Sequence, residues 1–448
     1  MCLICSFYLM RKKMTGSNMV LFPKQRWVVT LVALVTAVAA GCGSPVAEFR
    51  PNVGFQLKSE AEAGAVLTDD QQNNIATILE GLFGTPDEPH IPEVPNVEMT
   101  RLLDQTAIEM AGGPVHVDED GRTHGLFRRH CAHCHGITGD GMGPTAEFLN
   151  PYPRDYRSGI FKFKSTVKNA RPTREDLHRI LKNGIPGTAM PSFRVLPEDQ
   201  KEALVQYVIY LSMRGELERR LVPESLGLGE LGIEGDQLFL NLSDKGGEIF
   251  TERSVYIREQ LAAIGNRWLH AESAEVPAPP ENWGSAESLV RGRELFFGKG
   301  ACSGCHGNFG LGDGNTTFSV DKPFLDDWTK ENWPEVKDKD EIKRQRPIRA
   351  AAGILEKRPL RPRNLRLGVY RGGRRPIDLY YRLRHSIEGT PMPGLEIATG
   401  DDDPTKPTAE EKLTAEDIWS ILDYVRNLPF EPISQPHKQL RNLKRERL

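Results

Sequence analysis

The chain has 448 residues, of which 39% are hydrophobic and 27% are charged, so it is long enough to form two or three domains with buried cores. The formal net charge is only −3, which argues against a protein that binds nucleic acid through its overall charge. The composition is that of an ordinary globular protein, and the motifs must indicate what it does.

The N-terminus has the pattern of a targeting segment. Lys24 and Arg26 precede an apolar run over residues 27–40 that ends in small residues, as in a secretory signal. At about 14 residues, this run is shorter than the roughly 20 residues that a membrane span needs. We therefore assign residues 1–41 to a leader, with Met19 as a candidate start.

The end of this leader resembles a bacterial lipoprotein cleavage site. The sequence "VAAGC" implies that Cys42 is lipidated as the first residue of the mature chain, although Ala39 stands where that family most often has Leu. An uncleaved anchor and plain cleavage are the alternatives. Residues 42–114 are interpreted as a tether that spaces the rest of the chain from the membrane, with one helix ending near Gly84.

Four of the seven cysteines lie beyond the leader and its cleavage site, in two Cys-x-x-Cys-His motifs: Cys131, Cys134 and His135, and Cys302, Cys305 and His306. A Cys-x-x-Cys pair followed by histidine indicates covalent attachment of c-type haem, because each thiol can bond a vinyl group and the imidazole then lies beneath the iron. A zinc site would need four ligands from nearby pairs, and a redox dithiol would need a βαβ context. We expect two haem c groups.

An internal repeat surrounds the two motifs. Three blocks recur in the same order without gaps: "PRDYRSGIFK" and "PRNLRLGVYR", "DLHRILKNGIPGTAMP" and "DLYYRLRHSIEGTPMP", and "LPEDQKEALVQYVIYL" and "LTAEDIWSILDYVRNL". The last blocks carry apolar stripes at 3,4,7 spacing, on Leu204, Tyr207, Val208 and Leu211 and on Ile421, Tyr424, Val425 and Leu428. Such stripes predict amphipathic helices that pack across a leading helix before each motif, "GRTHGLFRRH" or "AESLVRGRELFFGKG".

Over residues 120–215 and 286–430 the chain resembles the class I c-type cytochromes, twice over. The resemblance implies a mainly α fold: two tandem cytochrome c-like helical domains, at 115–215 and 285–430, joined by a helical linker. The linker, residues 216–284, contains the amphipathic stretch "RSVYIREQLAAIGNRWLHAE" and the stiff "EVPAPPEN", and it is a candidate brace between the modules. Residues 431–448 form a basic tail.

The repeat also indicates the second ligand of each iron. Met190 and Met392 occupy the same place in "GT-x-MP", where glycine and proline favour an irregular loop, and a thioether is a soft iron ligand. In the family this methionine is the distal ligand; the alternative is a gap-filling core methionine. The competing candidates are Met142, which lies close to its own haem motif, and His178 and His385, which have no matching histidine in the other module; His130 and His133 flank the thiols and are expected to face solvent or a propionate.

Cations are concentrated in the second module. Residues 343–384 contain fourteen Lys or Arg and two acidic residues, which favours either a docking face for an acidic redox partner or a solvated surface. Arg154 and Arg363, aligned in the repeat, are candidates to bind haem propionates, because a guanidinium matches a carboxylate.

Two haems closed by histidine and methionine leave no open iron site for substrate, which predicts electron transfer rather than chemistry on a substrate. We expect a membrane-tethered dihaem cytochrome at the outer face of a bacterial cytoplasmic membrane. It would exchange electrons with an oxidase, reductase or dehydrogenase and would not bind nucleic acid. A dihaem peroxidase or other haem c oxidoreductase with one open haem is the alternative, as is a subunit with no independent role.

Overall fold

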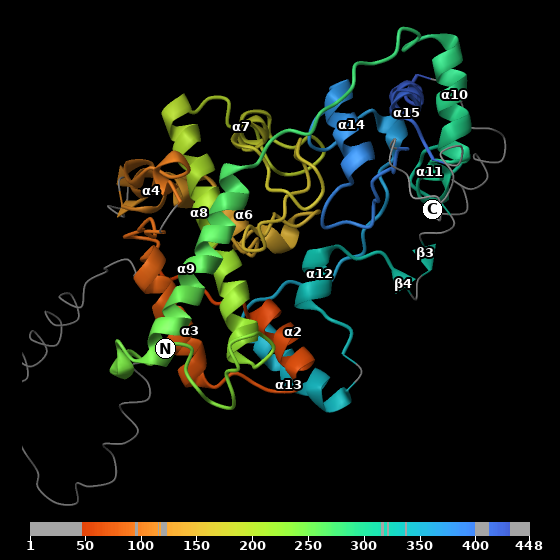
Figure 1. The fold of residues 1–448 in the computed structure, drawn as a ribbon. Coiled ribbons are helices and arrows are strands. Elements are labelled where there is room, and N and C mark those ends of the chain that lie inside the picture. The colour runs from red at the N-terminus through yellow and green to blue at the C-terminus, as the bar shows by residue number, and fades with distance from the viewer. Residues whose placement is uncertain are drawn as a thin grey trace, which may run out of the picture. The chain divides into compact units, whose positions relative to one another are not determined.

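A computed structural model describes residues 47–94, 97–114, 116–117, 123–314, 318–319, 322–336, 338–398 and 412–430. Within these ranges the chain is helical apart from two hairpins of two-residue strands, so the predicted mainly α class is confirmed (Figure 1). The predicted leader, the lipidation site Cys42 and the basic tail 431–448 lie outside the described residues. No helix in the described ranges is both long and apolar enough to cross a membrane.

The elements before and through the first module are α2 (Val53–Ala63), α3 (Asp69–Phe83), the 3-10 turn η2 (Met99–Arg101), α4 (Gln105–Gly112), β1 (His116–Val117), β2 (Thr123–His124), α5 (Leu126–His130), α6 (Ala132–His135), η3 (Ala146–Phe148), α7 (Arg174–Asn183) and α8 (Glu198–Ser225). After them come η4 (Leu242–Asp244), α9 (Glu248–Leu269), α10 (Ala286–Phe297), α11 (Cys302–His306), β3 (Phe318–Ser319), β4 (Lys322–Pro323), α12 (Asp327–Asn332), α13 (Lys339–Ala351), η5 (Leu365–Leu367), α14 (Pro376–His385) and α15 (Ala415–Asn427). In each hairpin the two strands pair antiparallel.

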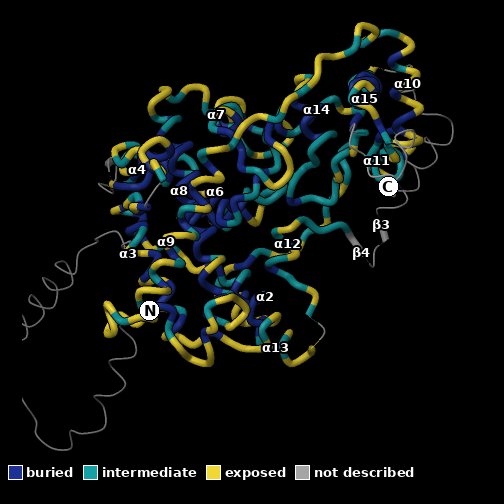
Figure 2. Tube along the Cα trace, viewed as in Figure 1, coloured by how far each residue is buried: buried dark blue, intermediate teal, exposed yellow. Residues whose placement is uncertain are grey.

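Helix α8 is the centre of the first module's core. It packs against α3, α4, α5, α7 and α9, and most of its length is buried (Figure 2). Leu204, Tyr207 and Leu211 of the predicted stripe are buried, and the Tyr207 ring lies 5.1 Å from that of Phe127. The helix continues to Ser225, so the predicted module boundary at residue 215 falls inside it.

The predicted leading helix of this module is shorter than expected. The stretch "GRTHGLFRRH" is helical only from Leu126, because Thr123 and His124 pair as a strand with His116 and Val117. Helix α4, which the sequence did not predict, provides the missing surface against α8: a Cβ at Gly112 would lie 2.6 Å from the Tyr207 ring. The close approach of α4 to α8 therefore needs a glycine at this position.

The segment interpreted as a tether is packed against the first module. It contains α2 and α4 in addition to the one predicted helix, α3, which begins with a capping box at Thr68 and ends at Gly84 as expected. The N–H of Asn52 donates to Glu218 Oε1 over 2.6 Å, and the N–H of Asp104 donates to Gln206 Oε1 over 2.6 Å. These contacts attach the segment to α8.

The second module places α10 directly across α15 (Figure 1). A Cβ at Gly292 would overlap the carbonyl oxygen of Ser420, so the two backbones can approach this closely only at a glycine. The Phe296 and Tyr424 rings meet at 5.3 Å, and all four residues of the predicted stripe are buried. This pair of helices confirms the predicted arrangement of leading and terminal helices.

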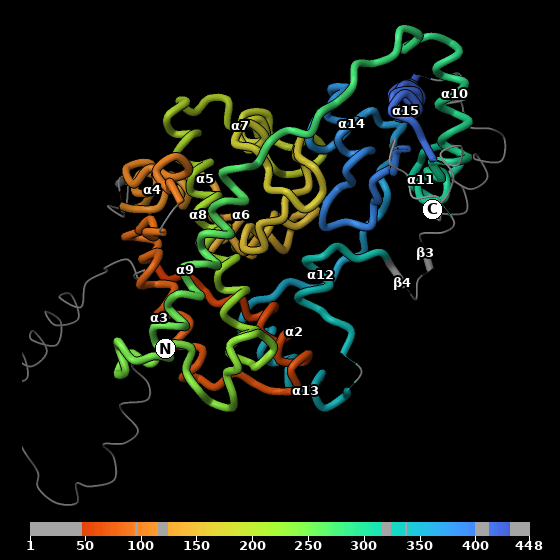
Figure 3. The backbone as a smooth tube through the Cα atoms, viewed as in Figure 1, coloured from red at the N-terminus to blue at the C-terminus, as the bar shows by residue number. Residues whose placement is uncertain are grey.

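The connector runs along both modules, as the tube in Figure 3 shows. Helix α9 packs on α8 through Leu261, Ile264 and Trp268, which lie in the predicted amphipathic stretch. The extended stretch after it contacts the first module where Ala274 N–H donates to the carbonyl of Ser165 (2.8 Å). It reaches the second where the Trp419 indole donates to the carbonyl of Pro277 (3.1 Å).

Candidate haem sites

Each Cys-x-x-Cys-His motif ends in a short helix that stops at a glycine. Gly136 and Gly307 follow the two histidines with φ of 72° and 77°, where a side chain would strain the backbone. The glycine six residues after each histidine donates its N–H to that histidine's carbonyl, over 2.9 Å in the first module and 2.8 Å in the second. The same loop therefore follows both motifs.

The four motif cysteines are unpaired thiols in a largely buried setting. Burial raises the pKa of Cys131 to about 12 and that of Cys302 to about 11. A redox dithiol needs a lowered thiol pKa, so these surroundings disfavour that alternative. Among the described residues no group of three or more His, Cys, Asp or Glu side chains is arranged to hold a metal ion.

Both motif histidines are oriented by a backbone carbonyl from the same place in the repeat. His135 Nδ1 donates to the carbonyl of Arg154 over 3.0 Å, and His306 Nδ1 donates to that of Arg363 over 3.0 Å. A carbonyl only accepts, so each ring has its proton on Nδ1 and Nε2 is left as the ligand atom. Burial lowers the pKa of His135 to about 4 and also lowers that of His306, which keeps both imidazoles neutral.

The two predicted methionine ligands lie in loops with the same hydrogen bonds. Thr188 Oγ1 donates to the carbonyl of Ile185 (2.8 Å) and accepts from the N–H of Met190 (3.1 Å). In the second module the corresponding distances are 2.6 Å from Thr390 to the carbonyl of residue 387 and 3.3 Å from Met392 to Thr390. The "GT-x-MP" sequence thus folds alike in both modules.

A cavity of about 280 Å³ in the first module brings its predicted ligands together. Its walls are mostly apolar, and they include Cys131, Cys134, His135, Met190, Phe127 and Leu181. Two thiols, an imidazole nitrogen and a thioether around one apolar cavity are the donor set that haem c takes. The residues present therefore fit this group.

The competing ligand candidates are placed differently. His178 Nε2 lies 2.5 Å from Glu202 Oε2, and neither this histidine nor Met142 lines the cavity. His130 and His133 do line it, next to the attachment cysteines. His385 in the second module stacks near Tyr381 at 6.5 Å, and burial lowers the pKa of its imidazole to about 4.

The two arginines predicted to bind propionates direct their side chains across the module boundary. A Cβ at Gly187, in the Met190 loop, would overlap Arg363 Nη2. A Cβ at Gly389, in the Met392 loop, would lie 3.7 Å from Arg154 Nη1. Each arginine thus orients its own module's histidine through its carbonyl, and its guanidinium reaches the methionine loop of the other module.

Sequence reasoning missed two cations at the cavity, Lys162 of the first module and Arg371 of the second. Arg371 of the second module lines the cavity of the first, together with Met190. In the aligned ten-residue blocks Arg371 occupies the same position as Lys162. A cation at the last position of both blocks was therefore the sequence signal that could have indicated these residues.

The fold and the paired motifs define a protein with two helical haem-binding modules. Residues 119–208 match the family model for cytochrome c oxidase, cbb3-type, subunit III, and residues 289–429 match the family model for cytochrome c. The chain therefore contains two cytochrome c domains in tandem, in agreement with the class I resemblance found in the sequence. Such domains hold covalently attached haem c and transfer electrons.

Two other comparisons add little. A chain of the Kuenenia stuttgartiensis reducing HAO-like protein complex is similar at 22% identity, with a TM-score of 0.41, over 68% of this chain and 93% of that one. A comparison with curated proteins finds no match.

Proposed function

We propose that this protein is a dihaem cytochrome that moves single electrons between redox partner proteins. The first haem is attached to Cys131 and Cys134, and the second to Cys302 and Cys305. The observation that supports this most strongly is the repeated pair of ligand loops, in which a carbonyl-oriented histidine and a threonine-capped methionine recur with the same hydrogen bonds. Bound haem supplies a one-electron iron couple.

The chain's own residues would close both coordination positions of each iron. His135 and Met190 line one cavity in the first module, and His306 and Met392 occupy the equivalent loops in the second. A methionine ligand would raise the reduction potential of the bound haem relative to a second nitrogen ligand, and the apolar wall would keep water away from it. Closed positions favour a carrier over an enzyme that binds peroxide.

The basic stretch of the second module supports docking to an acidic redox partner. Arg346, Arg361 and Arg374 are exposed within residues 343–384. Exposed charge mainly accelerates and orients encounter between partners, so we propose an oxidase, reductase or dehydrogenase with an acidic docking face.

We further propose that the protein works at the outer face of a bacterial cytoplasmic membrane, held by lipid on Cys42. The leader-like residues 1–41 and the "VAAGC" sequence support this, since haem c is attached to exported chains. Labelling with a radioactive fatty acid in the producing cell, compared with a Cys42→Ala variant, tests the anchor.

The test of the function is a redox titration of the purified holoprotein followed by visible spectra. We expect two low-spin one-electron couples, and we expect Met190→Ala and Met392→Ala each to lower the potential of a different couple. A high-spin ferric component in the unaltered protein, with rapid turnover of hydrogen peroxide, would replace the carrier by the dihaem peroxidase. Unchanged couples in both variants would overturn the ligand assignment.

A further inference from the structure

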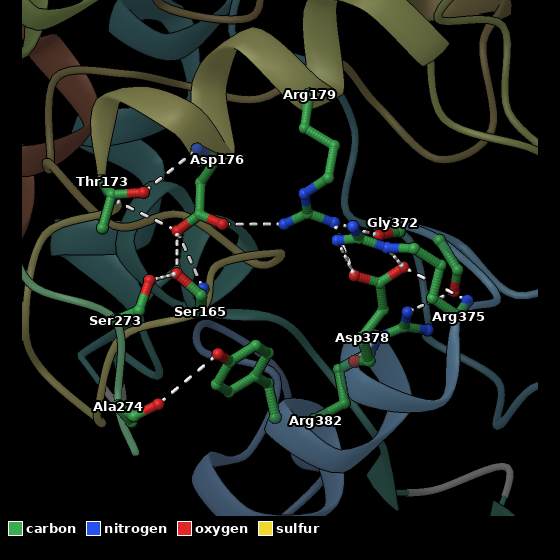
Figure 4. Close-up of polar contacts among 12 residues, drawn as sticks. Ser165, Thr173, Asp176, Arg179, Ser273, Ala274, Gly372, Arg375, Asp378 and Arg382 are labelled. Atoms are coloured by element: carbon green, nitrogen blue, oxygen red, sulfur yellow. Dashed lines mark hydrogen bonds and ion pairs between the residues drawn. The ribbon is translucent and has the colours of Figure 1, made fainter. Parts of the chain in front are cut away.

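The two modules meet through equivalent elements of the repeat. Arg179 of α7 donates to Asp176 of its own helix (2.8 Å) and to Asp378 at the start of α14 (3.0 Å), as Figure 4 shows. The two aspartates occupy the same repeat position, and each closes a capping box at its own helix start. Nearby, buried Lys164 pairs with Glu388 at 2.9 Å. Charged groups therefore hold the two modules face to face.

The aligned ten-residue blocks bring four cations to this boundary, two from each module: Arg154 and Lys162, and Arg363 and Arg371. Burial, together with the charges of Arg154 and Arg371, lowers the pKa of Lys162 to about 8. These groups are therefore close enough to repel one another. Such a cluster is stable only if anions lie among the cations.

Protein groups satisfy part of this cluster. Lys162 Nζ lies 3.2 Å from Asp326 Oδ2, and the same carboxylate acts on Arg154. Arg363 Nε donates to the carbonyl of Val369 over 3.1 Å. Three of the four cations, Lys162, Arg154 and Arg363, thus interact with protein groups.

Arg371 is the cation whose partner is missing. Its Nε is buried with no hydrogen-bond partner among the described residues. Burial lowers the pKa of this guanidinium, and the neighbouring Arg363 lowers it further. A buried donor on a charged group is costly to leave unpaired, so an anion belongs beside it.

The place of Arg371 indicates which anion this is. Among the described residues that line the first module's cavity, it is the one that comes from the second module. Haem carries two propionate carboxylates, and an arginine fork matches a carboxylate. We propose that Arg371 of the second module binds a carboxylate of the haem held in the first module. This inference rests on the proposed function, because it requires haem in that cavity.

The contact makes the second module part of the first haem's site. A positive charge beside a haem favours the reduced state, so the potential of the first couple depends on a residue of the other module. Arg154, which the sequence indicated for this role, also lines this cavity, and both Arg154 and Arg363 reach the opposite methionine loops.

The test compares three variants of the full holoprotein by redox titration. Arg371→Gln removes the charge, Arg371→Lys keeps it, and Arg374→Gln removes an equal charge from an exposed neighbour outside the cavity wall. A Met190→His variant marks the first-module couple, because replacing its thioether by imidazole lowers that potential.

We expect Arg371→Gln to shift the marked couple to lower potential, with the second couple moving no more than in Arg374→Gln. Arg371→Lys should retain most of the potential, and the low-spin spectra should stay unchanged in all three. A shift equal to that of Arg374→Gln, or one confined to the second couple, would overturn the contact. Those results would leave the carrier function standing, whereas failure to attach two haems would end both.

Discussion

In each module the helix before the methionine loop (α7 or α14) contacts the terminal helix (α8 or α15) at the same repeat position. The side chains that make this contact differ in chemistry between the two modules. In the first module His178 of α7 lies 2.5 Å from Glu202 of α8, with Arg174 on the same carboxylate. In the second the aligned residues are aromatic: the Tyr380 and Trp419 rings meet at 5.0 Å. The methionine loops that follow α7 and α14 nevertheless have the same hydrogen bonds. The conformation of the methionine loop therefore depends on the hydrogen bonds of the loop itself more than on the contact between the two helices.

The strongest test of this independence is to remove one pair of attachment cysteines at a time. Cys131→Ala with Cys134→Ala should leave one covalent haem per chain, and so should Cys302→Ala with Cys305→Ala, because each motif loop is hydrogen-bonded within its own module. Intact mass and the spectrum of the denatured haem measure the count. Loss of both haems in either double variant would mean that the modules load as one unit.

The difference between the two helix contacts predicts unequal stability losses. Trp419→Ala removes a buried side chain that contacts both Tyr380 and Trp283, and it should lower the free energy of unfolding by about 3–5 kcal/mol. Glu202→Ala removes a partly exposed ionic contact and should cost only about 1 kcal/mol. Denaturant unfolding of the holoprotein measures both. Equal losses would show that the ionic contact is as important as the aromatic one.

The shared methionine loops can be compared by placing alanine at the same repeat position. Gly187 and Gly389 have φ of 73° and 72°, so alanine strains either loop by about 1–2 kcal/mol. At Gly187 the new methyl would also overlap Arg363 Nη2, whereas the nearest atom at Gly389 is 3.6 Å away. We expect Gly187→Ala to be the more destabilising of the two in thermal unfolding. The reverse order would contradict the position of Arg363.

Much of each site could be predicted because it is encoded locally. The glycine after each histidine, the threonine two residues before each methionine and the stripe on α15 all act on neighbours in sequence. The duplicated blocks doubled each of these signals. Helix α3 was found for the same reason, since Thr68 and Gly84 mark its two ends.

What the sequence did not reveal depends on contacts between distant residues. Helix α4 has few residues and is stabilised by packing on α8, so its own pattern was too short to predict it. The directions of Arg154 and Arg363 follow from how the modules face each other, which a repeat cannot specify. Arg371 was missed because the module that contributes it is not the one whose cavity it lines.

The smallest expected effect is a pH dependence that only the ionic contact provides. Hydrogen bonding to His178 lowers the pKa of the Glu202 carboxyl to about 2, below its ordinary value near 4.5. A carboxyl whose pKa is lower in the folded than in the unfolded protein stabilises the fold above pH 4.5, where it is ionised in both states. The stabilisation by Glu202 therefore disappears as the pH falls from 4.5 towards 2. Glu202→Gln should therefore lose a few tenths of a kcal/mol at about pH 6, since the group is partly exposed, and show a flatter stability curve between about pH 5 and about pH 2. Acid titrations of folding, followed by circular dichroism at fixed denaturant, measure both curves.

The matched control lies in the aromatic contact of the second module, where neither partner is a carboxylate. Trp419→Phe should lower stability by the same amount at every pH in that window, because neither ring of the Tyr380 and Trp419 pair changes charge there. The contrast between the two variants therefore isolates the carboxylate from the general loss of packing. Parallel acid profiles for the unaltered protein and Glu202→Gln would show that this carboxylate does not stabilise the first module.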